Sequence, residues 1–177
     1  MRRVGAELGT GAGSLYRYVQ NRDELLELMS DHVAGEYSLD NEPGDWLADL
    51  VDLGLQAREI HRRHPWLPDL VMTSPGVGPR TVDVLEHYLS VVAPISADDS
   101  TKLTAFAVLN ALVASIARNE QAGAALQRNA EYLTHVAVAG THPRISALRV
   151  SDRGPQDPLP DILRAVLRGF FETGSSA

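Results

Sequence analysis

Apolar residues recur at intervals of three and four along most of the chain, and this spacing predicts an all-α protein. The longest regular pattern covers residues 45–64, where large apolar side chains return once per helical turn. No run of two-residue alternation predicts a strand. Helices are predicted at residues 2–8, 12–19, 22–37, 45–64, 66–72, 80–92, 98–121, 124–139 and 161–171.

The Asn-Glu-Pro-Gly run at residues 41–44 is the clearest interruption of this pattern, because proline and glycine end helices. We therefore divide the chain into a small N-terminal unit, residues 1–40, and a larger helical body, residues 41–177. The helix predicted at residues 98–121 is apolar on more than one face, which is typical of a helix covered on all sides. It is either the central helix of the body or a helix covered by a second subunit.

The N-terminal unit is predicted to contain two short helices joined by a tight turn. Val4 and Leu8 share one face of the first helix, and Gly9 has the position of a left-handed residue that ends a helix. Ala12 and Leu15 are spaced to face the interior from the second helix. This order predicts a helix-turn-helix whose second helix reads DNA. The alternative is an ordinary helical hairpin at the start of an all-α domain.

Charge is unevenly distributed along the chain. The net charge is −7, but residues 1–22 carry four arginines against one acid, a net +3, which leaves −10 on the rest. A basic end on an acidic body is expected where only that end meets phosphate. Arginines that merely keep a helix soluble are the alternative.

Several other classes of protein are disfavoured. The chain has no cysteine, which excludes disulfides and thiolate metal sites. His61 and His64, with Glu59 nearby, offer two imidazoles on one helix face, but no third ligand has suitable spacing. We predict no metal, no cofactor and, without a Ser/His/Asp or paired-carboxylate pattern, no enzymatic activity. Since neither a signal-peptide pattern nor an uninterrupted apolar stretch of membrane-spanning length is found, we expect a cytoplasmic protein without a membrane partner.

Three motifs near the N-terminus resemble the DNA-binding module of the tetracycline-repressor (TetR) family. They are the Leu-Gly turn at residues 8–9, Ser-Leu-Tyr-Arg-Tyr at 14–18 and Asn-Arg-Asp-Glu-Leu-Leu at 21–26. The His-Pro-Trp run at residues 64–66 and the apolar helix at 98–121 are similar to the family's C-terminal domain. The resemblance implies a helix-turn-helix DNA-binding domain at residues 1–40, and a helical domain for ligand binding and dimerisation at residues 41–177.

The implied function is that of a ligand-responsive transcriptional regulator. A family member of this kind binds palindromic operator DNA as a homodimer, acts as a repressor, and is released by a small-molecule effector. The family module normally has a further helix before the point that corresponds to Met1, so we expect a DNA-binding domain without its first helix. The alternative is a dimeric ligand-binding or interaction module that does not bind DNA.

Candidate DNA contacts follow from the chemistry of the major groove. A reading helix needs small or hydrogen-bonding side chains at its N-terminal end, where it approaches the bases. Tyrosine and arginine suit contacts to phosphate, and the resemblance implies that Arg2 reads guanine. The predicted DNA-binding residues are Arg2, Arg3, Thr10, Gly11, Ala12, Gly13, Ser14, Tyr16, Arg17, Tyr18 and Arg22.

The helical body is expected to hold an apolar effector pocket with a few polar anchors. The candidate ligand-binding residues are Trp66, Leu67, Met72, Tyr88, Phe106 and Asn110. Asn110 is the most informative, because it is a polar residue in an apolar helix and needs a hydrogen-bond partner if it is buried. The alternative is that Asn110 faces solvent or bonds within the core.

The dimer interface is predicted on the two most apolar helices of the body. Two such helices from each subunit would form a four-helix interface, and alanines would allow close approach. The candidate interface residues are Leu103, Phe106, Val113, Ala117, Ile162, Val166 and Phe170. The alternative is that both helices complete the core of a monomer.

Overall fold

The computed structural model describes residues 1–73, 76–148 and 157–172, and these residues form helices and no strand. The predicted all-α class is therefore confirmed. The helices are α1 (Arg2–Glu7), α2 (Ala12–Leu15), α3 (Arg22–Ala34), α4 (Trp46–Arg63), α5 (Leu67–Thr73), α6 (Pro79–Val92), α7 (Asp99–Gln121), α8 (Gly123–Ala139), α9 (Pro143–Ser146) and α10 (Leu159–Phe171).

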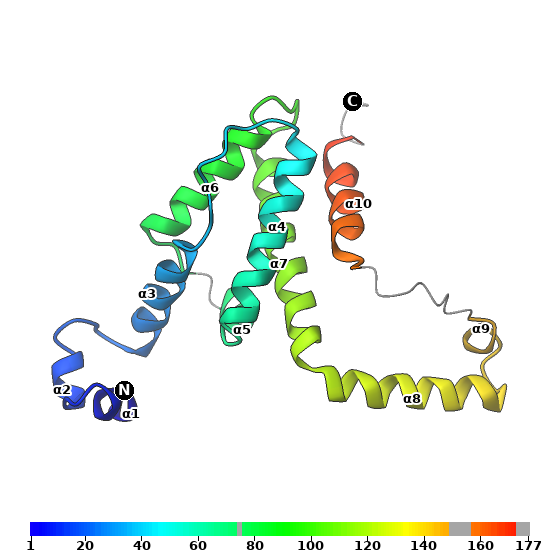
Figure 1. Cartoon of the computed structure of the whole chain (residues 1–177), viewed down its shortest axis with the longest axis horizontal. Helices are drawn as coiled ribbons and strands as arrows, with labels where there is room; N and C mark the ends of the chain where they lie inside the picture. Colours follow the sequence, from blue (N-terminus) through cyan, green and yellow to red (C-terminus); the bar gives the residue numbers. More distant parts are fainter. Residues whose placement is uncertain (74–75, 149–156, 173–177) are drawn as a thin grey trace.

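Helices α4 and α7 lie side by side in the middle of the molecule (Figure 1). Helix α10 packs against both, α5 packs against the lower part of α7, and α6 contacts α3, α4 and α7. Helix α3 leads away from this body to α1 and α2, which pack on each other at the far end (blue in Figure 1). The small N-terminal pair is thus joined to the body through one helix.

The core lies where α4, α6, α7 and α10 meet. Its fully buried side chains include Leu50, Tyr88, Val92, Val113 and Leu163. Burial of one large aliphatic side chain contributes roughly 1.5–3 kcal/mol, so this cluster dominates the stability of the fold. The core fixes the position of α4 between α6, α7 and α10.

Helix α7 is the apolar helix of the sequence, and two of its predicted interface residues face the core. Val113 is 0% exposed and Ala117 is 1% exposed, so the protomer already covers them. The prediction that they meet a second subunit was wrong, because hydrophobicity alone does not distinguish the faces of an apolar helix. By length and composition alone α7 would also suit a membrane span, contrary to our expectation, and 28% of the relevant window is buried inside the structure.

Helix α8 projects from the end of α7 and carries α9 at its tip (Figure 1). Tyr132, Leu133 and Val138 on α8 are 68%, 51% and 83% exposed, respectively. The helix ends at Gly140, which adopts a left-handed conformation with φ 70°. Helices α8 and α9 therefore form an arm outside the packed body.

Gly54 allows α10 to approach α4 closely. A Cβ atom added to Gly54 would lie 2.7 Å from Cδ1 of Leu163, which is itself fully buried. Both α4 and α10 depend on this approach, because Leu163 also belongs to the core formed with α7.

Replacing Gly54 by Ala is expected to lower the free energy of unfolding by about 1–3 kcal/mol, because the buried Leu163 cannot move aside freely. The matched control is Gly123→Ala, since a Cβ there meets nothing within 4 Å. The control should be unchanged or stabilised by up to about 1 kcal/mol. Urea unfolding at one protein concentration measures both, and equal stability of the two variants would contradict the packing described.

Candidate DNA-binding surface and effector cavity

The turn between α1 and α2 is built on Gly9. This residue has φ 66°, a region that glycine enters without strain, and the Thr10 N–H donates to the Gly5 carbonyl at 2.8 Å. Helix α2 is a single turn that ends at Leu15, so the predicted extension to Val19 was too long. Tyr18 and Val19 nevertheless remain bonded to the Leu15 carbonyl, at 2.9 and 3.1 Å, and Val19 is buried.

The predicted DNA-binding side chains lie mostly on the surface of this N-terminal pair. Tyr16 is 52% exposed and Tyr18 is 82% exposed, so both hydroxyls are accessible to a partner. Arg2, Arg3 and Arg17 form no ion pair with any residue that the structure describes. The exposed members of the set are Arg2, Arg3, Gly11, Gly13, Tyr16, Arg17, Tyr18 and Arg22; Thr10 and Ser14 are half-buried, and the Ala12 side chain lies outside the description.

The start of α3 is fixed by reciprocal capping. The Glu24 N–H donates to Oδ1 of Asn21 at 2.8 Å, and the Glu24 carboxylate accepts from the Gln20 N–H. The arrangement resembles a capping box, except that the Glu24 carboxylate bonds to the residue before the N-cap, and it ties the segment after α2 to the first turn of α3. The direction of α3 therefore determines where α1 and α2 point.

Helix α3 is held to the body at two places. Oδ1 of Asp31 accepts from the N–H and the hydroxyl of Thr81, at 2.9 and 3.1 Å, and so caps the start of α6. Just beyond α3, Glu36 pairs with His64 and Arg63, both at 2.7 Å. The hydrogen bond from His64 lowers the pKa of Glu36.

A cavity of about 400 Å³ lies between α3, α4, α5, α6 and α7. This volume is within the range of small-molecule sites in proteins. Its walls are mainly apolar, and α3 supplies three of the lining residues, Ser30, Val33 and Ala34. The lining residues are Ser30, Val33, Ala34, Tyr37, Ile60, His61, Leu67, Val71, Met72, Gly76, Thr81, Val84, Phe106, Ala107, Asn110 and Ala111.

Comparison with known proteins identifies the family. The family described as "Tetracyclin repressor-like, C-terminal domain" matches residues 39–153. This chain belongs to the tetracycline-repressor family. It is 34% identical over 169 residues to the HTH-type transcriptional repressor DrrR1 of Streptomyces coeruleorubidus, covering 88% of this chain and 63% of the relative.

Solved structures of the family share the fold. Apo ActR from Streptomyces coelicolor is 25% identical, with a TM-score of 0.77 over 99% of this chain and 88% of that chain. ActR in complex with actinorhodin is 24% identical, with a TM-score of 0.75 over 100% of this chain and 88% of that chain. A further relative, the HTH-type transcriptional regulator of Saccharopolyspora erythraea, is 31% identical over 66% of this chain and 50% of its own length. The chain thus spans 63% and 50% of the two sequence relatives.

Within this family fold, four of the six predicted ligand-binding residues line the cavity: Leu67, Met72, Phe106 and Asn110. Tyr88 does not, because it is fully buried in the core and its hydroxyl donates to the Lys102 carbonyl at 2.8 Å. Trp66 does not either, since it packs against His64 outside the cavity, with ring centroids 5.9 Å apart. These two predicted residues therefore do not line this cavity.

Asn110 bonds within its own helix and also faces the cavity. Its amide nitrogen donates to the Phe106 carbonyl at 2.9 Å. One polar group is thus satisfied by the backbone, as the alternative interpretation held. His61 and Tyr37 also line the cavity, but they were not among the predicted ligand-binding residues. The spacing offered one signal for His61, because it falls one helical turn after Ala57 on the buried face of α4.

The histidine pair considered as a metal site is divided by the fold. His61 faces the cavity, whereas Nε2 of His64 contacts the Glu36 carboxylate at 2.7 Å. In the described part of the chain, no group of three His, Cys, Asp or Glu residues is arranged to hold a metal ion.

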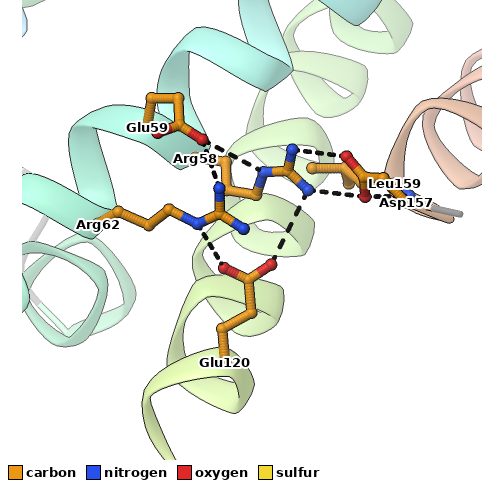
Figure 2. A network of polar contacts seen from close by, with 6 residues as sticks. All are labelled: Arg58, Glu59, Arg62, Glu120, Asp157 and Leu159. Carbon is orange, nitrogen blue, oxygen red and sulfur yellow. Dashed lines mark hydrogen bonds and ion pairs between the residues drawn. The ribbon is translucent and has the colours of Figure 1, made fainter. Parts of the chain in front are cut away.

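A charged cluster joins α4, α7 and the start of α10 (Figure 2). The Arg58 side chain is 10% exposed, and its guanidinium donates to both Asp157 oxygens at 2.7 and 2.6 Å. Glu120 lies 3.9 Å from Arg58 and accepts from Arg62 at 2.9 Å. The Asp157 carboxylate also accepts from the Leu159 N–H at 3.1 Å.

The cluster has a structural role. The hydrogen bonds from Arg58 hold the pKa of Asp157 below its usual value, and those bonds raise the pKa of Arg58. Both side chains are therefore charged at neutral pH, and the bidentate contact fixes the start of α10 against α4.

Replacing Asp157 by Asn should lower the free energy of unfolding at pH 7 by about 1–3 kcal/mol, because a largely buried Arg58 loses its charged partner. Since the folded-state pKa of Asp157 is lowered, its contribution is present above the unfolded value of about 3.9 and is lost as the pH falls through the folded value. The difference in the free energy of unfolding between Asp157→Asn and the native protein should therefore become smaller below about pH 4.

The control is Asp161→Asn, whose side chain is 89% exposed and pairs with Arg164 only one turn away. Exposed pairs of this kind contribute at most about 1 kcal/mol. Urea unfolding across the pH range measures both variants; a pH-independent effect of Asp157→Asn would show that charge is not its cause.

Proposed function

We propose that this chain is a transcriptional repressor that binds operator DNA as a homodimer in the cytoplasm and is released by a small-molecule effector. One observation carries the proposal: α3 bears the exposed helix-turn-helix at its N-terminal end and forms a wall of the cavity at its C-terminal end. The named repressor function of DrrR1 supports it.

Contact with DNA is supported by the chemistry of the N-terminal surface. The guanidiniums of Arg3 and Arg17, which form no ion pair with any described residue, can neutralise phosphates, and the exposed Tyr16 hydroxyl can donate to a phosphate oxygen. The small residues Gly11 and Gly13 leave room for α2 to approach the major-groove floor. In this assignment tyrosine and arginine position the module, and Arg2 with the start of α2 reads bases.

Release by an effector is supported by the route from the cavity to α1 and α2. Ser30, Val33 and Ala34 on α3 and Tyr37 just beyond it all line the cavity. A ligand that binds one orientation of α3 more tightly increases the population of that orientation. Because α1 and α2 are carried by α3, their positions shift with it. ActR has been crystallised with actinorhodin, and we propose an unidentified, largely apolar effector for this chain by analogy.

Tyr16→Ala should weaken binding to a palindromic fragment from the DNA upstream of the protein's own gene by roughly fivefold to twentyfold, because a phosphate contact is lost. The matched control is Tyr132→Ala on α8, a tyrosine that is 68% exposed against 52% for Tyr16. Fluorescence anisotropy over a range of salt concentrations measures both. If the two variants bind the DNA fragment with equal affinity, Tyr16 does not belong to the DNA-binding surface.

The same titration separates the proposal from its rival, a dimeric ligand-binding module without DNA activity. The rival predicts no salt-dependent binding to operator DNA. The naming of the relatives as repressors and regulators of transcription favours the proposal.

Dimerisation is proposed through the uncovered faces of α7 and α10. Leu103 is 48% exposed and Ile162 is 38% exposed, and Val166 and Phe170 are half-buried. Phe106 is less available, because it packs on Tyr88 and lines the cavity. The revised interface therefore retains Leu103, Ile162, Val166 and Phe170 and excludes Val113 and Ala117.

Ile162→Arg is expected to shift the protein towards monomers by at least tenfold in dissociation constant, because an unpaired charge would be buried between subunits. Val82→Arg, at an apolar position of α6 that is 49% exposed, is the control and should leave association unchanged. Sedimentation velocity over a dilution series measures the dissociation constant of each variant. A dimer that is unaffected by Ile162→Arg would mean that the interface lies elsewhere.

A further inference from the structure

The walls of the cavity carry no charged side chain among the described residues. Five of them are polar: Ser30, Tyr37, His61, Thr81 and Asn110. The remainder are aliphatic residues, glycine, one methionine and the ring of Phe106. A charged ligand would lose its hydration here without gaining an ion-pair partner, so the lining favours an uncharged one.

Among the described residues that line the cavity, His61 has a buried ring nitrogen that the protein leaves without a hydrogen-bond partner. It is 4% exposed, and its Nδ1 is buried without a hydrogen-bond partner. A buried polar atom of this kind is unfavourable and is normally paired. Two other polar residues differ, since the Thr81 hydroxyl donates to Asp31 and the Asn110 amide donates to the Phe106 carbonyl.

The state of the imidazole restricts what it can bind. Burial lowers the pKa of His61 to about 4, so the ring is neutral at physiological pH. A neutral imidazole presents one N–H donor and one nitrogen acceptor. A ligand hydroxyl can pair with a ring nitrogen that faces the cavity whether or not that nitrogen carries the proton, because a hydroxyl both donates and accepts, whereas a carbonyl can only accept.

Aromatic side chains indicate the shape of the ligand. Phe106 and Tyr37 both line the cavity, and aromatic walls favour contact with another ring. Met72, which is 47% exposed, adds an adaptable apolar contact at the border of the cavity with solvent.

We propose that the effector is an uncharged, hydroxyl-bearing aromatic compound whose hydroxyl hydrogen-bonds to His61 while its rings lie among Phe106, Tyr37 and the aliphatic walls. This inference rests on the proposed function, since it takes the cavity as the effector site. His61 is the specificity-determining residue, because it distinguishes a hydroxyl from an apolar group of similar size.

The test uses a hydroxylated fluorene and the fluorene with a methyl group at the same position, two neutral three-ring probes of similar size. Fluorescence titration measures their binding to the whole chain without DNA. The hydroxylated probe should bind roughly fivefold to tenfold more tightly, which corresponds to one net hydrogen bond. A fluorene carboxylate should bind more weakly than both.

Three variants make the test specific. His61→Leu should abolish the preference for the hydroxyl, and His61→Gln should restore part of it because an amide can also donate and accept. His32→Leu on the exposed side of α3 is the matched control and should leave the preference unchanged. Thermal unfolding checks that each variant is folded. If His61→Leu does not fold, the test is the comparison of His61→Gln with the native protein.

The outcomes separate this inference from the function on which it rests. A hydroxyl preference that depends on His61 supports it. Equal binding of the two probes, or a preference that survives His61→Leu, overturns the role of His61 and leaves the cavity as an effector site. Failure of every neutral probe to bind up to its solubility overturns the cavity as the site, and with it the proposed effector release.

Discussion

The contact between α10 and α4 is the constraint on which the rest of this structure depends. Gly54 lets Leu163 lie directly on the α4 backbone. One turn later, Arg58 forms an ion pair with Asp157, which lies just before α10. Helix α4 is therefore held on one side by α10. Its other side, at Ile60 and His61, is a wall of the cavity. The shape of the cavity thus depends on packing that no ligand touches.

Helix α3 has a second role besides carrying α1 and α2. Asp31 caps α6 from outside that helix, and Glu36 joins two basic residues at the end of α4. These polar contacts are directional, whereas the apolar contacts of Val33 and Ala34 with the cavity tolerate small shifts. Helix α3 is therefore attached to the body by polar contacts with α6 and with the end of α4, and by the apolar contacts of its cavity side.

The ends of the helices were largely predictable, because they depend on local chemistry. Gly9 adopts the left-handed conformation, Asn21 caps α3, and Asp45 caps α4 through a 3.0 Å bond from the Leu47 N–H. Cavity residues were predicted less well, since periodicity shows that a helix is apolar but not which neighbour each face meets. Tyr88 and Trp66 were therefore misplaced. The partner of Arg58 lies 99 residues away, and no local pattern connects such a pair.

That separation has a consequence for biosynthesis. A ribosome makes the chain from its N-terminus, so α4 emerges about a hundred residues before α10 can cover it. During that interval the surface around Gly54 and Leu50 is exposed to solvent, and Arg58 has no carboxylate from Asp157. The core around Leu50 and Leu163 is therefore completed only after α10 has been made, and a nascent chain leaves this apolar face of α4 uncovered until then.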